Sequence, residues 1–310
     1  MAEMSGDILD NKLNENKKIL LVINPNAGKT KPMSMLSDIL DVFTKSGFET
    51  IALSTKRKND ATDIVKNNGN DCNIVVCCGG DGTLNEVING VMCLEKTIPI
   101  GYIPTGTSND FATSLGLSTD YKEAAKDIAG GKLLAHDIGS FNGERYFNYV
   151  ASFGAVSDVS YLTSQKAKNI FGQSAYIIEG FKALFKMRSF HATVEYDGQI
   201  IEDAFILGGA SNSKSIGGVI RLKSEEISMN DGIFELIFFR KPRHPADVSR
   251  IASWMFKQNK DNESVIYTHA ASVRITSEEY IPWTVDGEFE GYNKEVNIEA
   301  VHGSIKFLCP

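Results

Sequence analysis

The chain has 310 residues, of which 42% are hydrophobic and 23% are charged, and its formal net charge is −7. This is the composition of an ordinary globular protein, and the length suggests two domains. The acidic balance argues against a nucleic-acid-binding protein, which is normally basic. No apolar run approaches the roughly 18 residues of a membrane-spanning helix.

Residues 1–16 are polar and charged, and we expect a disordered leader without a signal sequence. The five cysteines have neither the spacing of metal ligands nor that of a disulfide framework. They are Cys72, Cys77, Cys78, Cys93 and Cys309. A reducing compartment fits this usage, and we therefore expect a cytoplasmic protein.

Apolar strands alternate with helical patterns through the first half of the chain. Ile19–Ile23 and Ile74–Cys78 are unbroken apolar runs, and Ile98–Ile103 predicts a further strand. Helical spacing is found at 35–43, 61–67 and 121–129, and residues 50–54 predict a strand. This alternation predicts an α/β domain with a parallel sheet, whose ligands bind beyond the carboxyl ends of the strands.

The turn Gly79–Thr83 lies between the strand Ile74–Cys78 and a helical pattern that begins at Leu84. A strand, a glycine turn and a helix in this order bring backbone N–H groups and the helix dipole close to an anion, and phosphate is the expected guest. Asp81 would repel phosphate unless a cation such as Mg²⁺ lay between them. The alternative is a tight turn in which Asp81 caps the helix.

Two further loops follow strands at the same expected edge of the sheet. The loop Asn24–Lys29 has a turn composition, and Lys29 is either a phosphate contact or a surface lysine. The loop Pro104–Asp110 offers hydroxyl groups and a second acid, although alone it also reads as an N-cap turn. No Walker A pattern occurs, which argues against a P-loop NTPase.

After about residue 135 short segments alternate polar with β-branched and aromatic residues. They are 145–151, 192–196, 204–209, 233–239, 272–276 and 296–300. They predict a second, mainly antiparallel β domain, a sandwich, with helices at 171–187 and 246–257. Lys56–Lys58 and Arg240–His244 are basic runs that are either solvated loops or membrane-facing contacts.

Two acidic spots stand out in this second half. Asp231, in Ser228–Ile233, either occupies a β-turn or holds a hard cation together with neighbouring carbonyl groups. Asp286 and Glu288 flank Gly287, and in an extended segment they would share one face. One could then accept a proton while the other helps to hold a metal, or the pair is a plain Asp–Gly turn.

Four motifs occur in one order: Asn24–Lys29, Gly79–Val87, Pro104–Ala112 and Val285–Glu288. With them, residues 17–310 resemble the soluble bacterial diacylglycerol kinases, which are related to sphingosine and ceramide kinases. The resemblance implies an α/β nucleotide domain like that of NAD kinases at 17–136. It also implies a β-sandwich lipid domain at 137–302, with a final strand, about 303–310, that returns to the first domain.

The resemblance further implies a set of residues that contact ATP. They are Asn24, Pro25, Asn26, Ala27, Gly28, Thr55, Gly80, Asp81, Gly82, Thr83, Leu84, Asn85, Glu86 and Thr107. Asp81 and Asp110 would join a Mg²⁺–water network at the phosphates. A second, structural Mg²⁺ would be held by Asp231, with oxygens from Ser228 and Ile233. Glu288 would be the general base, and Asp137 matches an acid of the linker near the cleft.

The expected activity is transfer of the γ-phosphate of ATP to a lipid hydroxyl, with diacylglycerol giving phosphatidic acid. A sphingoid base, monoacylglycerol, undecaprenol or phosphatidylglycerol is an alternative acceptor, and NAD kinase and a non-enzymatic nucleotide sensor are other readings. We expect peripheral contact with a membrane surface, no nucleic acid and a homodimer. Thr113 stands where many relatives have Arg, which would weaken a charge pairing near the nucleotide.

Overall fold

The computed structural model describes residues 17–28, 32–107, 109–154, 186–213, 215–216, 220–221, 228–258 and 262–310. The chain divides into two compact units, and each is described here by itself. Unit 1 comprises residues 1–134 together with 305–310, and unit 2 comprises residues 135–304. The expected boundary lies at 136/137, and the expected return of the chain to the first unit lies at about 303. The expected helix at 171–187 lies almost entirely outside the described residues, as does Lys29.

Unit 1 contains a parallel sheet in the order β4-β3-β1-β2. The strands are β1 (Lys17–Ile23), β2 (Phe48–Ser54), β3 (Ile74–Gly79) and β4 (Ile100–Pro104). The end of β15 (Glu288–Cys309) joins this sheet, because Phe307 pairs in parallel with Ile100 of β4. β3 and β4 are buried along their whole length, which explains why they are continuous apolar runs.

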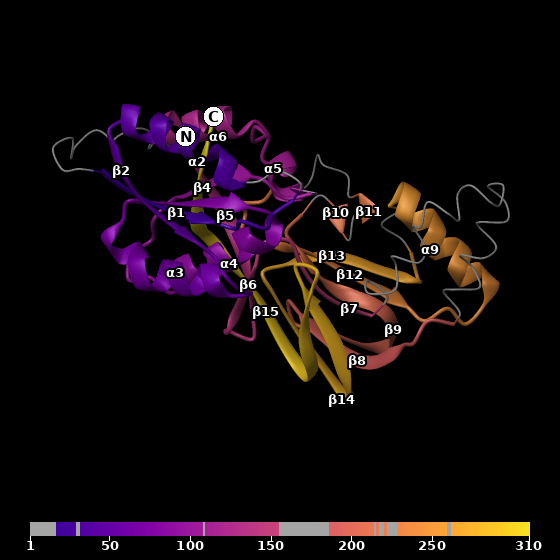
Figure 1. Cartoon of the computed structure of the whole chain (residues 1–310). Helices are drawn as coiled ribbons and strands as arrows, with labels where there is room; N and C mark the ends of the chain where they lie inside the picture. Colours follow the sequence, from indigo (N-terminus) through magenta and orange to yellow (C-terminus); the bar gives the residue numbers. More distant parts are fainter. Residues whose placement is uncertain are drawn as a thin grey trace, which may run out of the picture. The chain divides into compact units, whose positions relative to one another are not determined.

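Helices lie on both faces of this sheet (Figure 1). Figure 1 shows α2 (Pro32–Lys45) and α6 (Tyr121–Gly130) on one side, and α3 (Asp60–Asn68) and α4 (Asp81–Val91) on the other. Phe43 of α2 and Ile128 of α6 pack in one cluster with Leu21 and Val76 of the strands. The short helix α5 (Asp110–Ser114) follows β4. The predicted alternation of strands and helices is therefore confirmed, with element ends shifted by a few residues.

Unit 2 is built mainly from antiparallel strand pairs. The strands are β5 (Lys132–Phe141, which begins in unit 1), β6 (Arg145–Phe147), β7 (Val150–Gly154), β8 (Phe190–Tyr196), β9 (Gln199–Ser211), β12 (Phe234–Arg240), β13 (Val265–Ala270), β14 (Ser272–Val285) and β15. β10 (Ser215–Ile216) and β11 (Ile220–Arg221) form a separate two-stranded sheet. The expected mixture of an α/β part and a mainly antiparallel part is thus present.

Two long strands, β9 and β14, join the strand pairs of unit 2 into one continuous sheet. β9 pairs with β8 through its first half and with β7 through its second half. β14 likewise pairs with β8 near its start and with β7 near its end. Phe153, Phe238 and Trp283 lie at the centre of the apolar cluster that these strands enclose.

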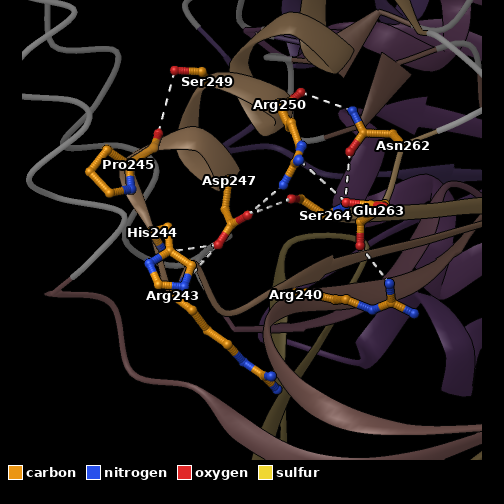
Figure 2. Close-up of polar contacts among 10 residues, drawn as sticks. All are labelled: Arg240, Arg243, His244, Pro245, Asp247, Ser249, Arg250, Asn262, Glu263 and Ser264. Atoms are coloured by element: carbon orange, nitrogen blue, oxygen red, sulfur yellow. Dashed lines mark hydrogen bonds and ion pairs between the residues drawn. The ribbon is translucent and has the colours of Figure 1, made fainter.

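The basic run Arg240–His244 precedes helix α9 (Pro245–Lys257). Asp247 accepts hydrogen bonds from the backbone N–H groups of Arg243 and His244, both at 2.9 Å, and pairs with Arg250 (Figure 2). Arg240 and Arg243 both form ion pairs with Asp203. Much of the charge of this run is therefore balanced within unit 2, which favours the solvated-loop interpretation.

Candidate active site

Three loops of unit 1 meet at the carboxyl ends of β1, β3 and β4. The backbone N–H of Asn24 donates to the carbonyl of Cys78 at 2.9 Å, and that of Thr105 donates to the carbonyl of Gly79 at 2.8 Å. The amide Nδ2 of Asn24 also donates to the Thr83 hydroxyl at 2.9 Å. The loops after β1, β3 and β4 are thus bonded to one another, as the sequence analysis expected for a shared site.

Glycines allow these loops to approach at backbone distance. A Cβ atom on Gly28, whose φ is +62°, would lie 2.1 Å from the carbonyl oxygen of Thr105. A Cβ atom on Gly106 would lie 2.6 Å from the Cα of Gly80. Gly82 differs, because a Cβ atom there would meet nothing within 4 Å. Gly28 and Gly106 therefore serve the packing of the loops, whereas Gly82 leaves open space in the first turn of α4.

Asp81 is the first residue of α4, and the N-cap position is occupied by Gly80 without a side-chain cap. The alternative in which Asp81 caps the helix is therefore wrong. Its Oδ1 accepts a hydrogen bond from the backbone N–H of Phe111 at 3.3 Å and lies 3.5 Å from the Tyr102 hydroxyl. Burial, together with the charge of Asp81, raises the pKa of Tyr102 far above its usual value, so this hydroxyl stays protonated and can donate.

The residues expected to contact ATP differ in their exposure. Asn26, Gly28 and Thr107 of the loops and Gly82 of α4 are exposed, whereas Leu84 and Asn85 are buried. The remaining members of the set are buried or half-buried: Asn24, Pro25, Ala27, Thr55, Gly80, Asp81, Thr83 and Glu86. The side chain of Asp110 lies outside the description.

The carboxylate of Glu86 accepts hydrogen bonds from the backbone N–H groups of Asn59 at 2.8 Å and Ala61 at 3.1 Å. It thereby satisfies donors at the start of α3, where a helix leaves its first N–H groups without partners. Structural contacts therefore account for this carboxylate without a nucleotide.

In unit 2, Asp286 and Gly287 form the turn between β14 and β15, with φ angles of +47° and +81°. The Asp286 carboxylate accepts three backbone N–H groups, from Asn148 at 2.8 Å, Tyr149 at 2.8 Å and Val150 at 3.0 Å. Of the two interpretations left open, the extended segment with Asp286 and Glu288 on one face is wrong, and the Asp–Gly turn is confirmed. In this turn the Asp286 carboxylate binds the backbone of residues 148–150, which is a structural role.

Glu288 opens β15 directly after this turn. Its side chain is 35% exposed, and its Oε2 lies 3.6 Å from the Arg145 guanidinium. The Nε of the same guanidinium lies 3.8 Å from Oε2 of Glu290. Glu288 is therefore an accessible carboxylate beside a fixed positive charge.

Asp137, which is fully buried, holds the loop that contains Asp231 through hydrogen bonds. The Asp137 carboxylate accepts the backbone N–H groups of Gly232 and Gly303, both at 2.6 Å, and contacts Nδ1 of His302 at 2.9 Å. The Asp231 side chain is exposed and accepts the backbone N–H of Ile233 at 3.2 Å. Asp137, the acid expected in the linker, thus contacts the loop in which Asp231 is proposed to hold a cation.

The donor chemistry of this loop fits a hard cation only in part. Within the described ranges, no group of three or more His, Cys, Asp or Glu side chains is placed to hold a metal ion. One carboxylate, from Asp231, is available there, and further ligands would have to be backbone oxygens of Ser228 and Ile233. None of the helices in the described ranges has the length and apolar character needed to span a bilayer.

Sequence similarity to known proteins shows the family of this chain. The model of the diacylglycerol kinase catalytic domain matches residues 18–141. A diacylglycerol kinase of Staphylococcus carnosus (strain TM300) is 37% identical over 277 residues, which cover 89% of this chain and 90% of that protein. The chain belongs to the diacylglycerol kinase family.

Two further comparisons agree with this assignment. The diacylglycerol kinase of Bacillus subtilis (strain 168) is 32% identical over 278 residues, covering 89% of this chain and 91% of that protein. A crystal structure of a diacylglycerol kinase from Bacillus anthracis (strain Sterne) has a TM-score of 0.73 at 23% identity, covering 95% and 97% of the two chains, and supports the fold. As a diacylglycerol kinase family member, the protein is a lipid kinase, a phosphotransferase with an alcohol group as acceptor.

Two residues beside the family motifs were not foreseen. Tyr102 lies in an apolar strand, where an aromatic residue is normally part of the core, and Arg145 begins a short strand far from Glu288 in sequence. A weak signal existed for Arg145, because an isolated cation in an otherwise apolar and aromatic strand requires a nearby acid. Nothing in the local sequence distinguishes Tyr102 from a core residue.

Proposed function

We propose that this kinase transfers the γ-phosphate of ATP, in the presence of Mg²⁺, to the hydroxyl of a lipid, with diacylglycerol giving phosphatidic acid. The observation that carries the proposal is the set of three loops bonded to one another at the N-terminus of α4. Open space beside Gly82 and the first N–H groups of a helix, which have no partner within the helix, suit a phosphate group. A nucleotide domain of the NAD kinase type is part of this proposal.

The proposed chemistry is an in-line displacement at the γ-phosphorus. Glu288 accepts the proton of the lipid hydroxyl, a bond forms from the hydroxyl oxygen to the γ-phosphorus, and the bond to the leaving oxygen of ADP breaks. Backbone N–H groups at the start of α4 stabilise charge on the phosphates. Asp81 and Asp110 are proposed to hold Mg²⁺ at the phosphates, where the ion would neutralise part of that charge, and Asp231 is proposed to hold a second, structural Mg²⁺.

A lipid panel tests the acceptor. Labelled γ-phosphate of ATP–Mg²⁺ is offered with diacylglycerol, monoacylglycerol, sphingosine, ceramide, undecaprenol and phosphatidylglycerol in mixed micelles. We expect label in phosphatidic acid. Label in another lipid would keep the mechanism and replace the acceptor, and label in no lipid would overturn the proposed lipid kinase activity. NAD, read out as NADP, is included as the soluble acceptor.

The same assay tests the general base. Glu288→Gln should lower kcat by about 100-fold or more while the affinity for ATP stays within about threefold of wild type. Glu278→Gln is the control, because Glu278 is an exposed acid of the same hairpin. Turnover of Glu288→Gln near that of wild type would show that another group takes the proton.

Contact with a membrane surface is a further part of the proposal, because the acceptor is a lipid. Tyr280, Phe289 and Tyr292 are exposed by 61%, 59% and 62% on the β14–β15 hairpin, and Lys294 lies over the Tyr280 ring. Tyrosine and lysine suit the polar boundary of a bilayer. Co-sedimentation with acceptor-containing vesicles tests this contact, and no sedimentation above a vesicle-free control would contradict it.

A homodimer is also proposed, and sedimentation equilibrium tests it.

A further inference from the structure

The turn that carries Glu288 is fixed to one neighbouring segment of unit 2. Asp286 accepts the backbone N–H groups of residues 148–150, and its own N–H donates to the carbonyl of Val150 at 2.9 Å. Beyond the turn, Val285 and Thr284 pair with Ala151 and Ser152 of β7. The backbone position of Glu288 is therefore set by residues 148–152.

The same segment is supported from inside the unit. The side chain of Asn148 is buried, and its Oδ1 lies 2.8 Å from Nε2 of His136, which is also buried. Burial lowers the pKa of His136 to about 4, so the ring is neutral and Nε2 can donate to Asn148 at neutral pH. Arg145 lies three residues before Asn148, the first residue of this supported segment.

Backbone anchoring does not fix the Glu288 side chain. A glutamate has three rotatable side-chain bonds, so its backbone alone does not determine where its carboxylate lies, and this side chain is 35% exposed. Arg145 is only 17% exposed and places Nη2 at 3.6 Å from Glu288 and Nε at 3.8 Å from Glu290. A guanidinium held by a second carboxylate is a directed positive charge beside Glu288.

We propose that Arg145 is a positioning residue that holds the Glu288 carboxylate where it receives the proton of the acceptor hydroxyl. The inference rests on the proposed role of Glu288. Its effect is on orientation, because a general base must lie within hydrogen-bond reach of the proton that it takes. Displacement of a reacting group by about 1 Å can cost about 100-fold in rate.

A second arginine–glutamate ion pair, on the β14–β15 hairpin that carries Glu288, is a control for this role. Arg274 and Glu295 link β14 and β15 at 3.0 Å, and both side chains are about half exposed. Exposed pairs of this kind contribute little to stability, and this one includes no residue of the proposed site. Arg274→Ala therefore controls for the loss of one arginine and one ion pair.

The experiment compares Arg145→Ala, Arg145→Lys and Arg274→Ala in the lipid kinase assay, with the Tm of each variant measured. We expect Arg145→Ala to lower kcat by about 10- to 100-fold with KM for ATP within about threefold. Millimolar guanidinium should restore part of the kcat of Arg145→Ala and leave Arg274→Ala unchanged. Arg145→Lys should lie between wild type and Arg145→Ala, because lysine keeps the charge but lacks the planar fork.

Each outcome distinguishes the two proposals. If Glu288→Gln is inactive and a folded Arg145→Ala keeps wild-type kcat, the positioning role fails while the proposed function stands. If Arg145→Ala loses kcat without rescue by guanidinium, and its Tm falls as well, the arginine is structural and the inference fails. If Glu288→Gln is active, the proposed base itself fails. Should Arg145→Ala not fold, Arg145→Lys decides: wild-type kcat and no response to guanidinium would overturn the role.

Discussion

Two carboxylates separated by one glycine have different surroundings in this protein. Asp286 accepts three backbone N–H groups, whereas Glu288 is partly exposed and faces a guanidinium. An acceptor that satisfies several partly buried donors is costly to remove, because the donors then lack both protein and water partners. At the scale of single residues, Asp286 thus maintains the turn, and Glu288 is the carboxylate of the pair that is proposed to take the proton.

Asp286→Ala should lower the free energy of unfolding by about 3 kcal/mol, and Asp286→Asn by about 1–2 kcal/mol, because asparagine keeps one acceptor. Urea unfolding followed by tryptophan fluorescence measures this in unit 2, since both tryptophans of the chain, Trp254 and Trp283, lie there. Asp197→Asn is the control, because Asp197 heads a second Asp–Gly turn, with φ angles of +46° and +75°, but is exposed. Unchanged stability of Asp286→Ala with lost turnover would assign Asp286 to the chemistry instead.

The residues that the sequence could not reveal are those defined by long-range contacts. The order of strand, glycine turn and helix at residues 74–91 was predictable because the three follow one another in the chain, but the expected turn Gly79–Thr83 is reduced to Gly80 between β3 and α4. The contact of Tyr102 with Asp81 crosses 21 positions, and Asp286 meets Asn148 across 138. Such contacts depend on which strands become neighbours, and local periodicity does not contain that information.

At the scale of elements, strand and helix types were predicted better than strand lengths. The segments expected at 272–276 and 296–300 are parts of β14 (Ser272–Val285) and β15 (Glu288–Cys309). Bulges interrupt the β14–β15 register between Thr276 and Ile281 and between Trp283 and Thr284. Because a bulge breaks the alternation of polar and apolar residues, the continuous strand was invisible to a period-two pattern.

The start of α4 permits a test of the phosphate site that leaves the fold intact. Gly82→Ala adds a Cβ atom where no protein atom lies within 4 Å, so stability should be unchanged or rise by up to about 1 kcal/mol. If phosphates bind in that space, the methyl group should weaken ATP–Mg²⁺ binding by about tenfold or more. Isothermal titration calorimetry measures the affinity.

Gly130→Ala is the matched control for this variant. Gly130 is also an exposed helical glycine of unit 1 with open space at its Cβ position, but it lies at the end of α6. Its substitution should leave the affinity for ATP unchanged. Equal ATP affinities of Gly82→Ala and wild type would show that the nucleotide phosphates do not approach the first turn of α4.

At the scale of the whole molecule, two buried titratable groups of unit 2 act on stability in opposite directions. Burial raises the pKa of Glu235 from 4.5 to about 7, and burial lowers that of His136 from 6.5 to about 4. Between pH 4.5 and 7 the folded state keeps a proton on Glu235 that the unfolded state has lost, so this group reduces stability as the pH rises. Between pH 4 and 6.5 the unfolded state protonates its histidine, so His136 increases stability as the pH rises.

These two slopes offset each other between pH 4.5 and 6.5, so the wild-type protein alone would conceal both groups. Glu235→Gln isolates one of them, because glutamine remains neutral in both states. The variant should gain stability over wild type as the pH rises from 4.5 to 7, reaching about 2–3 kcal/mol and then a plateau. Urea unfolding at several pH values, followed by tryptophan fluorescence of unit 2, measures this difference. A constant difference across that range would mean that Glu235 ionises in the folded state as readily as in water. Its burial on β12, which pairs with β9 and β13, would then have no electrostatic cost.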